Sequence, residues 1–197
     1  MKVSIDKNFE IAQPVSKVWE YLLDPYKVAE CVPGVKLTEK ISETEYKGDV
    51  GLKLGPVNAS FNGVITYAKV DEVAREIHLV GKGVDKKGKG SVEMALEMKL
   101  QESGNVTMVN TTMNVTVIGV MAQFGSRLIS DVSDHIFKQF VENFQTLLAG
   151  KEIDDQDKQI HGGAVTGTVV KSITSKLTSG VKNIFSKKDK KEENENE

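Results

Sequence analysis

The sequence is poor in cysteine and in long apolar runs. Cys31 is the only cysteine among 197 residues, so the chain cannot form an internal disulfide. No apolar stretch approaches the roughly 18–20 residues that span a bilayer, which predicts that the protein is not an integral membrane protein. The first residues, MKVSIDKNFEIA, alternate like a strand and lack the pattern of a secretory signal. We therefore expect an intracellular protein.

The usual signs of catalysis and metal binding are also missing. The three histidines have no metal-ligand spacing to one another or to cysteine and carboxylate residues, so we expect no metal site and assign no cofactor. The glycine-rich segment 81–90, GKGVDKKGKG, leads into a strand-like run, whereas a phosphate-binding loop would lead into a helix. Cys31 has no candidate base nearby in the sequence, which favours a small buried hydrophobe over a nucleophile.

Charge is distributed unevenly along the chain. Residues 164–191 hold seven lysines against one aspartate, and residues 192–197 hold four glutamates. Because the whole chain carries a net charge of −2, residues 1–163 are mildly acidic. This argues against nucleic acid as a partner of the body.

Hydrophobic spacing predicts an α+β body with two short helices. A half-buried strand over residues 3–11 precedes a helix that begins at Pro14, and a second short helix covers about 25–31. Period-two spacing then predicts six strands, and one long helix follows over 119–149. Short turns between consecutive strands indicate a curved antiparallel sheet of about seven strands around the long helix. The six strands cover residues 35–41, 44–54, 57–70, 74–84, 90–101 and 105–118.

Composition divides the chain into four parts. We predict a ligand-binding domain over residues 1–149, a polar linker over 150–163, a flexible basic amphipathic tail over 164–191 and an acidic disordered end over 192–197.

Four glycines fall on the side of the strands that should face the long helix: Gly48, Gly63, Gly81 and Gly83. Glycine has no side chain, and protein interiors are closely packed. The space left at these positions must therefore be filled by neighbouring groups that come closer, be removed by bending of the sheet, or remain as a cavity. The bending and cavity readings are compatible, since a curled sheet with methionines forms an adaptable apolar pocket.

The same alternation selects candidate lining residues. On the strands these are Phe61, Met94, Met98 and Met113, and Tyr46 and Tyr67 are candidate polar anchors because they would bring hydroxyls to the pocket. On the long helix we select Phe124 and Leu128. Cys31 and the following Val-Pro-Gly would close one end of the groove, with the cysteine as part of its lining.

The tail has an apolar stripe with lysines mostly on its other side. A helix of this kind suits an anionic membrane surface, although docking on the body or on a protein partner is an open alternative. The predicted contact residues are Lys171, Ile173, Lys176, Leu177, Lys182, Ile184 and Phe185.

Four segments, in order along about residues 1–149, carry a resemblance to a known family. They are LLDPYKVAECVPGV (22–35), GPVNASFNGVI (55–65), GKGVDKKGKGSVEM (81–94) and MAQFGSRLI (121–129). With the predicted order of elements, they resemble the CoxG family of carbon monoxide dehydrogenase subunits. This family belongs to the START/SRPBCC superfamily, whose members have the helix-grip fold.

The resemblance implies a non-enzymatic accessory protein of a molybdenum hydroxylase such as carbon monoxide dehydrogenase. Such proteins are associated with recruiting the enzyme to the membrane and with carrying a quinone to it, which implies a cytoplasmic protein that is peripheral at the inner face of the cell membrane. We therefore predict binding of a lipophilic molecule such as a quinone. The alternatives are a structural adaptor without a ligand and an enzyme of the cyclase or hydrolase kind found on this fold.

Overall fold

The computed structural model of the chain describes residues 1–54 and 57–153. The predicted linker from residue 154 onwards, the tail and the acidic end lie outside the described residues. The body follows the order predicted from the sequence, with one difference before the last helix. The elements are β1 (Lys2–Ile11), α1 (Val15–Leu22), α2 (Pro25–Cys31), β2 (Val35–Lys40), β3 (Glu45–Leu54), β4 (Val57–Asp71), β5 (Glu76–Asp85), β6 (Gly90–Ser103), β7 (Val106–Gly119), η1 (Val120–Phe124) and α3 (Gly125–Leu148).

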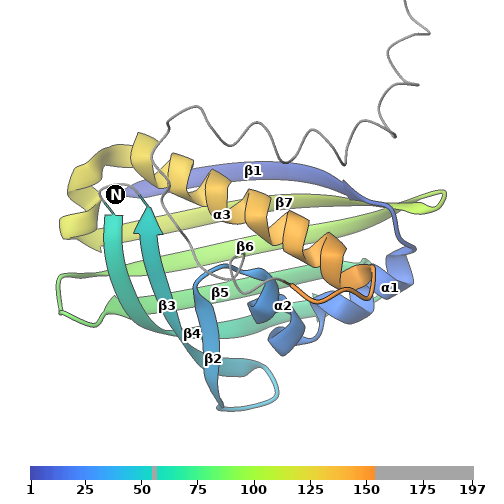
Figure 1. The fold of residues 1–197 in the computed structure, drawn as a ribbon, viewed down its shortest axis with the longest axis horizontal. Helices are drawn as coiled ribbons and strands as arrows, with labels where there is room; N and C mark the ends of the chain where they lie inside the picture. The colour runs from blue at the N-terminus through green and yellow to red at the C-terminus, as the bar shows by residue number, and fades with distance from the viewer. Residues whose placement is uncertain (55–56, 154–197) are drawn as a thin grey trace, which may run out of the picture. The chain divides into compact units, whose positions relative to one another are not determined.

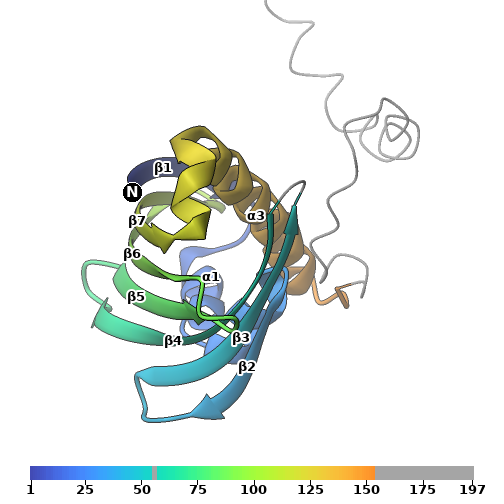
Figure 2. The ribbon, with the colours of Figure 1, turned by 90° about the vertical axis from the view of Figure 1, so that its left-hand side faces the viewer.

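The strands form one antiparallel sheet in the order β1-β7-β6-β5-β4-β3-β2. Strands β2 to β7 are neighbours in sequence and in space, as short turns require, whereas β1 pairs with the last strand, β7. The sheet curls, and α3 crosses its concave face (Figures 1 and 2). Burial in β7 follows the predicted faces, because Val109, Val115 and Val117 are buried while Asn114 is exposed.

The two short helices have clear local causes. Pro14 is the N-cap of α1, and the buried face of this helix is formed by Val18, Trp19 and Leu22 at helical spacing. The side chain of Asp24 caps α2 by accepting hydrogen bonds from the backbone N–H groups of residues 26 and 27, at 3.0 and 3.2 Å. Both helices therefore begin where the sequence predicts.

The prediction of one continuous helix over residues 119–149 was wrong at its start. The 3₁₀ helix η1 comes first, and α3 begins only at Gly125. Gly119 and Gly125 have φ angles of 90° and 83°, which glycine adopts far more easily than other residues. Each glycine thus allows a change of direction, and hydrophobic spacing alone does not reveal such a break.

Helix α3 is attached on one flank to β1. The ring of Phe137 meets Phe9 edge-to-face at a centroid distance of 5.3 Å, and Asp134 pairs with Lys7 at 2.9 Å. At the end of the helix, Lys17 Nζ donates to the carbonyl oxygen of Leu148 at 2.7 Å, where a positive charge also complements the helix dipole. These contacts fix the position of α3 over the sheet.

Buried apolar residues gather in three clusters. The basal cluster joins α1, α2, the end of α3 and the sheet, the second joins α3 to β3 and β4, and the third joins α3 to β7. The fully buried members of the basal cluster include Val18, Cys31, Val109 and Phe144, and the buried members of the other two include Phe61, Val132, Val117 and Ile129.

A row of glycines crosses three strands. Gly48 pairs with Gly63, and Gly63 pairs with Gly83. A Cβ atom at Gly48 would lie 2.9 Å from the carbonyl oxygen of Lys36, and one at Gly63 would lie 3.0 Å from that of Lys82. Neighbouring backbones therefore approach more closely here than side chains allow, which supports the reading that these glycines let the sheet curl.

Replacing Gly48 by alanine should destabilise the fold by about 1–3 kcal/mol, because the new methyl group meets backbone that cannot rotate away. Gly51→Ala on the same strand is the matched control, since a Cβ there has nothing within 4 Å. Urea unfolding should show a lower midpoint for Gly48→Ala and an unchanged or slightly higher one for Gly51→Ala. Equal midpoints would contradict the role given to the row.

Candidate functional site

The strand register brings four of the predicted lining and anchor residues together. Two rows of paired residues run across the middle of the concave face, and we call them the central strip. One row is Tyr46, Ile65, Gly81 and Met94, and the other is Tyr67, Leu79, Leu96 and Met113.

The central strip is less buried than the clusters on either side of it. Tyr46 is buried, but Ile65, Met94, Leu96 and the other side chains of both rows are only half-buried, although they point to the side that α3 crosses. Tyr46 and Ile65 belong to none of the three clusters. The other side chains pack against the basal cluster or the third cluster, so the helix leaves only part of the apolar surface in the middle of the concave face uncovered.

Flexible side chains partly fill the strip. A Cβ atom at Gly81 would meet Met94 Cε at 3.3 Å and Ile65 Cδ1 at 3.6 Å, so these two side chains fold over the glycine. A methionine side chain has three rotatable bonds and repacks at low cost. The arrangement can therefore adapt to an apolar ligand without movement of the backbone.

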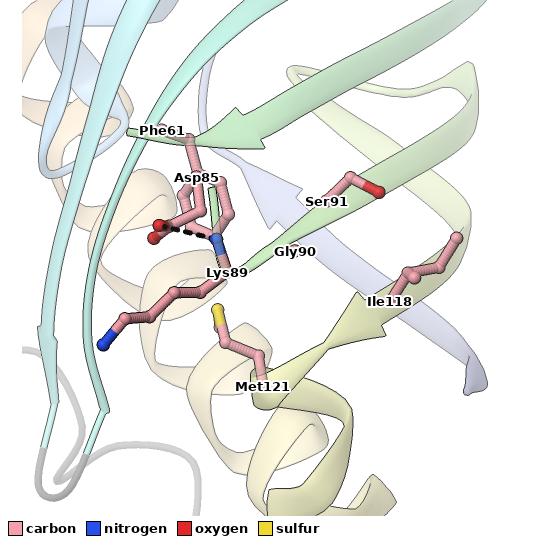
Figure 3. A pocket seen from close by; sticks show the side chains of 7 residues that line it. All are labelled: Phe61, Asp85, Lys89, Gly90, Ser91, Ile118 and Met121. Carbon is pink, nitrogen blue, oxygen red and sulfur yellow. Dashed lines mark hydrogen bonds between the residues drawn. The ribbon is translucent and has the colours of Figure 1, made fainter. Parts of the chain in front are cut away.

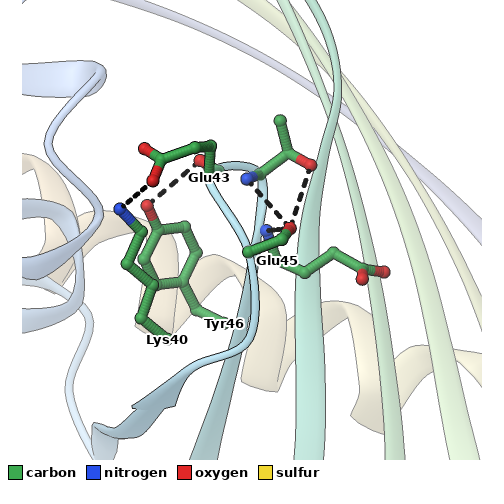
Figure 4. A network of polar contacts seen from close by, with 6 residues as sticks. Lys40, Glu43, Glu45 and Tyr46 are labelled. Atoms are coloured by element: carbon green, nitrogen blue, oxygen red, sulfur yellow. Dashed lines mark hydrogen bonds and ion pairs between the residues drawn. The ribbon is translucent and has the colours of Figure 1, made fainter.

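The two tyrosines form an aromatic pair whose hydroxyl protons are already used. Their ring centroids lie 6.4 Å apart in an edge-to-face arrangement. Tyr46 donates to the carbonyl oxygen of Glu43 at 3.2 Å, beside the ion pair of Glu43 with Lys40 (Figure 4). Tyr67 donates to the carbonyl oxygen of Leu22 at 3.2 Å, and burial raises its pKa. Both hydroxyls therefore bind backbone rather than a free position in the strip.

Cys31 is the last residue of α2 and lies in the basal cluster, outside the central strip. Its side chain is fully buried, and its carbonyl oxygen accepts a hydrogen bond from Asn143 Nδ2 at 3.0 Å. Burial, followed by the negative charge of Glu30, raises the pKa of the thiol to about 12. The thiol is therefore protonated at neutral pH, which supports its reading as a packing residue.

The other selected residues are spread over the interior and its edge. Phe61 is buried in the second cluster, with Leu128 half-buried against it, and Met98 is buried in the basal cluster. Phe124 is 41% exposed in η1. The expectation that Phe124 lines the interior therefore does not fit its position, because the chain changes direction at Gly125 before α3 begins.

Sequence reasoning missed several buried polar residues. Thr107 and Thr111 point to the concave side of β7 and donate to carbonyl oxygens of residues 13 and 7, at 2.7 and 3.0 Å. Asn143 is buried at a helical position that aligns with Phe140 and Phe144. Its spacing could have revealed it, because it falls within the apolar arc of α3.

Two hollows lie away from the central strip. One, of about 10 Å³, is lined by Phe61, Asp85, Lys89 and Met121 among others at the ends of β5 and β6 (Figure 3), and it has room for about one water molecule. A larger hollow, of about 450 Å³, is lined mostly by polar and charged residues. One of them, Glu76, lies on the outward face of the sheet. Neither suits a lipophilic ligand, so we place the candidate site at the central strip, where the exposed surface is apolar.

Among the described residues, no helix is long and apolar enough to cross a membrane. Within the same residues, no group of three histidine, cysteine or carboxylate side chains is placed to hold a metal ion.

The family model for the carbon monoxide dehydrogenase subunit CoxG matches residues 8–149. The chain belongs to the CoxG family. The match covers nearly all of the body, and it confirms the resemblance drawn from the four sequence segments. No curated protein sequence matches the chain significantly.

Solved structures confirm the helix-grip fold expected for a CoxG protein. A conserved protein from Geobacillus kaustophilus is 24% identical with a TM-score of 0.70, over 75% of this chain and 96% of that one. The Zhui aromatase/cyclase from Streptomyces sp. R1128 is 12% identical with a TM-score of 0.56, over 76% and 94%. A truncated norcoclaurine synthase from Thalictrum flavum is 13% identical with a TM-score of 0.55, over 77% and 96%. At these identities the likeness shows the fold alone.

Cys31 should resist alkylation in the folded protein. At pH 8 a thiol with a pKa of about 12 is almost entirely protonated, whereas a cysteine at its ordinary value of 9.0 is partly ionised. We expect iodoacetamide to react at least about a hundredfold more slowly with the native chain than with the chain in urea, measured by mass spectrometry. Similar rates in the two states would contradict the burial of this thiol.

Proposed function

We propose that this chain is a non-enzymatic binding protein for a lipophilic molecule, with a quinone as the best candidate, and that the ligand occupies the central strip beneath α3. The observation that carries the proposal is the half-burial of apolar side chains in the middle of an otherwise well-packed concave face. Exposed apolar surface of this kind costs free energy in water, and a ligand that covers it recovers that cost.

The proposed lining combines residues of the strip with neighbours from the clusters. Met94 and Met113 form part of the floor, and Phe61, Met98 and Leu128 lie at its margins. A ligand with an isoprenoid tail would gain about 25 cal/mol for each Å² of apolar surface that it buries, before the costs of association. Tyr46 and Tyr67 then act as aromatic walls rather than as hydroxyl anchors.

Family membership supports the proposed partner. The CoxG family is named for a subunit of carbon monoxide dehydrogenase, and we infer that this chain serves a molybdenum hydroxylase of that kind by presenting its ligand near a membrane. The protonated state of Cys31 fits a binding role better than a nucleophilic one.

The tail supplies the proposed membrane contact. Its lysines and apolar stripe, including Lys171, Ile173, Lys176, Leu177 and Lys182, lie outside the described residues, so this part of the proposal rests on sequence alone. Each lysine near anionic headgroups contributes about 1 kcal/mol of attraction. With this contact, the chain would be a cytoplasmic protein that binds peripherally to the inner face of the cell membrane.

A bulky residue in the strip should exclude the ligand. Met94→Trp enlarges a side chain that faces α3, whereas Ala95→Trp places the same side chain on the exposed outer face of the same strand. Solvent extraction of each purified protein, followed by mass spectrometry, should show at least a roughly tenfold loss of bound lipophilic molecule for Met94→Trp only.

Urea unfolding of both variants checks that each is folded. The carrier proposal would be wrong if the wild-type protein yielded no reproducible lipophilic molecule, or if Met94→Trp and Ala95→Trp retained equal amounts. The first outcome would favour a structural adaptor.

Removal of the tail should abolish binding to anionic vesicles. We expect the full chain to float with vesicles that contain phosphatidylglycerol, and a chain ending at residue 153 to remain in the dense fraction, because the cluster of lysines is lost. Vesicles of phosphatidylcholine alone serve as the neutral control. Equal flotation of the two chains would show that the tail does not bind the membrane.

A further inference from the structure

Three polar residues follow one another along the flank of α3 that faces away from β1. His135, Gln139 and Asn143 are spaced by four residues, which places them one above another on the same face of a helix. We call them the polar ridge. The opposite flank, with Asp134 and Phe137, makes the contacts to β1.

The neighbours of the polar ridge show where it lies. Val132, one turn before His135, packs in the second cluster with Leu52 and Phe61 of β3 and β4. At the other end, Asn143 donates to the carbonyl oxygen of Cys31 at the end of α2. The ridge therefore lies on the flank of α3 between the second cluster and the end of α2.

Two members of the ridge carry polar atoms that are shielded from water and have no hydrogen-bond partner among the described residues. These atoms are Nε2 of His135 and Oε1 of Gln139. Buried polar atoms are paired in the great majority of cases, because an unpaired one loses its bonds to water and gains nothing in return. The hydrogen bond of Asn143 shows that the ridge forms such bonds where the protein supplies a partner.

The described surroundings offer no ready replacement for these missing bonds. Residues on the same side of α3 are apolar, including Leu128 and Val132, and the tyrosine protons of the central strip are already donated to backbone carbonyls. The two atoms are thus buried polar groups among largely apolar neighbours on this flank of α3, and a few polar groups among apolar ones are the usual composition of a site for a mostly lipophilic ligand.

We propose that His135 and Gln139 bind the polar head of the ligand, and that the head carries a hydroxyl group. A hydroxyl can donate its proton to Gln139 Oε1 and accept a hydrogen bond from His135 when the imidazole proton is on Nε2. A carbonyl or an ether oxygen can only accept, so it would satisfy His135 and leave Gln139 Oε1 unpaired. With the amide of Gln139 oriented as in the structure, the pair therefore selects hydroxyl-bearing ligands, such as phenols or the hydroquinone form of a quinone. This inference rests on the proposed function, because it assumes a ligand in the strip.

The test uses two probes of nearly the same shape, 4-nonylphenol and its methyl ether 4-nonylanisole, and the full chain. We expect the wild-type protein to bind the phenol about tenfold more tightly than the ether in equilibrium dialysis, the ratio that one additional buried hydrogen bond gives. Gln139→Leu should reduce this ratio to about twofold or less, and His135→Phe should weaken both probes, because both can accept from the imidazole. Lys138→Leu, on the adjacent exposed position, should leave the ratio unchanged.

Urea unfolding separates binding from structural roles. Gln139→Leu should leave the midpoint of the ligand-free protein unchanged or raise it, because it removes an unpaired polar atom. Asn143→Leu should lower the midpoint, because it leaves the carbonyl oxygen of Cys31 without this donor. A lower midpoint for Gln139→Leu similar to that of Asn143→Leu would overturn the assignment of Gln139 as a binding residue.

The outcomes of the binding experiment distinguish failure of the polar head site from failure of the proposed lipophilic carrier function. Equal binding of the two probes to the folded wild-type protein would overturn the polar head site and leave the lipophilic carrier standing. Binding of neither probe would overturn both. An unchanged ratio in Gln139→Leu would show that the hydroxyl is recognised elsewhere.

Discussion

At Gly48 and Gly63, carbonyl oxygens of the neighbouring strands come within 2.9 and 3.0 Å of the points where Cβ atoms would stand. This close approach of backbones is the constraint on which the concave face depends, because it lets β3 and β4 turn round α3 while the ladder of hydrogen bonds continues. The same missing side chains lower the apolar bulk in the middle of the sheet. The glycines therefore account for the curvature, and under the proposed function the small volume of their side chains also leaves room for a ligand.

The two flanks of helix α3 make different contacts. One flank is tied to β1 by an aromatic contact and an ion pair, and the last turn is tied to α1 through Lys17. The other flank carries the polar ridge, in which Asn143 binds the backbone of Cys31 while His135 and Gln139 have no such partner among the described residues. A helix held by β1 on one flank, by α2 on the other and by α1 at its end can keep unpaired groups in place, as a preorganised binding site requires.

The fold that carries the central strip also carries other functions in other proteins. Structures with the same architecture include a protein named as an aromatase/cyclase and one named as a norcoclaurine synthase, so the helix-grip fold by itself does not decide between an enzyme and a binding protein. The decision depends on side chains. In this chain the only thiol is buried with a raised pKa, and the tyrosines of the central strip donate to backbone, which leaves apolar surface as the dominant chemistry of the strip.

The sequence by itself determined the order of elements, the faces of the strands and the family, because alternation, helical spacing and turn residues act over short distances along the chain. It also placed Met94, Met113, Tyr46 and Tyr67 on one face. Only the tertiary structure decided that η1 precedes α3, that Phe124 is exposed, and that Cys31 lies in the basal cluster. It alone showed which polar groups have partners, because a hydrogen bond such as that from Asn143 to Cys31 joins residues far apart in sequence, and no local pattern encodes that distance.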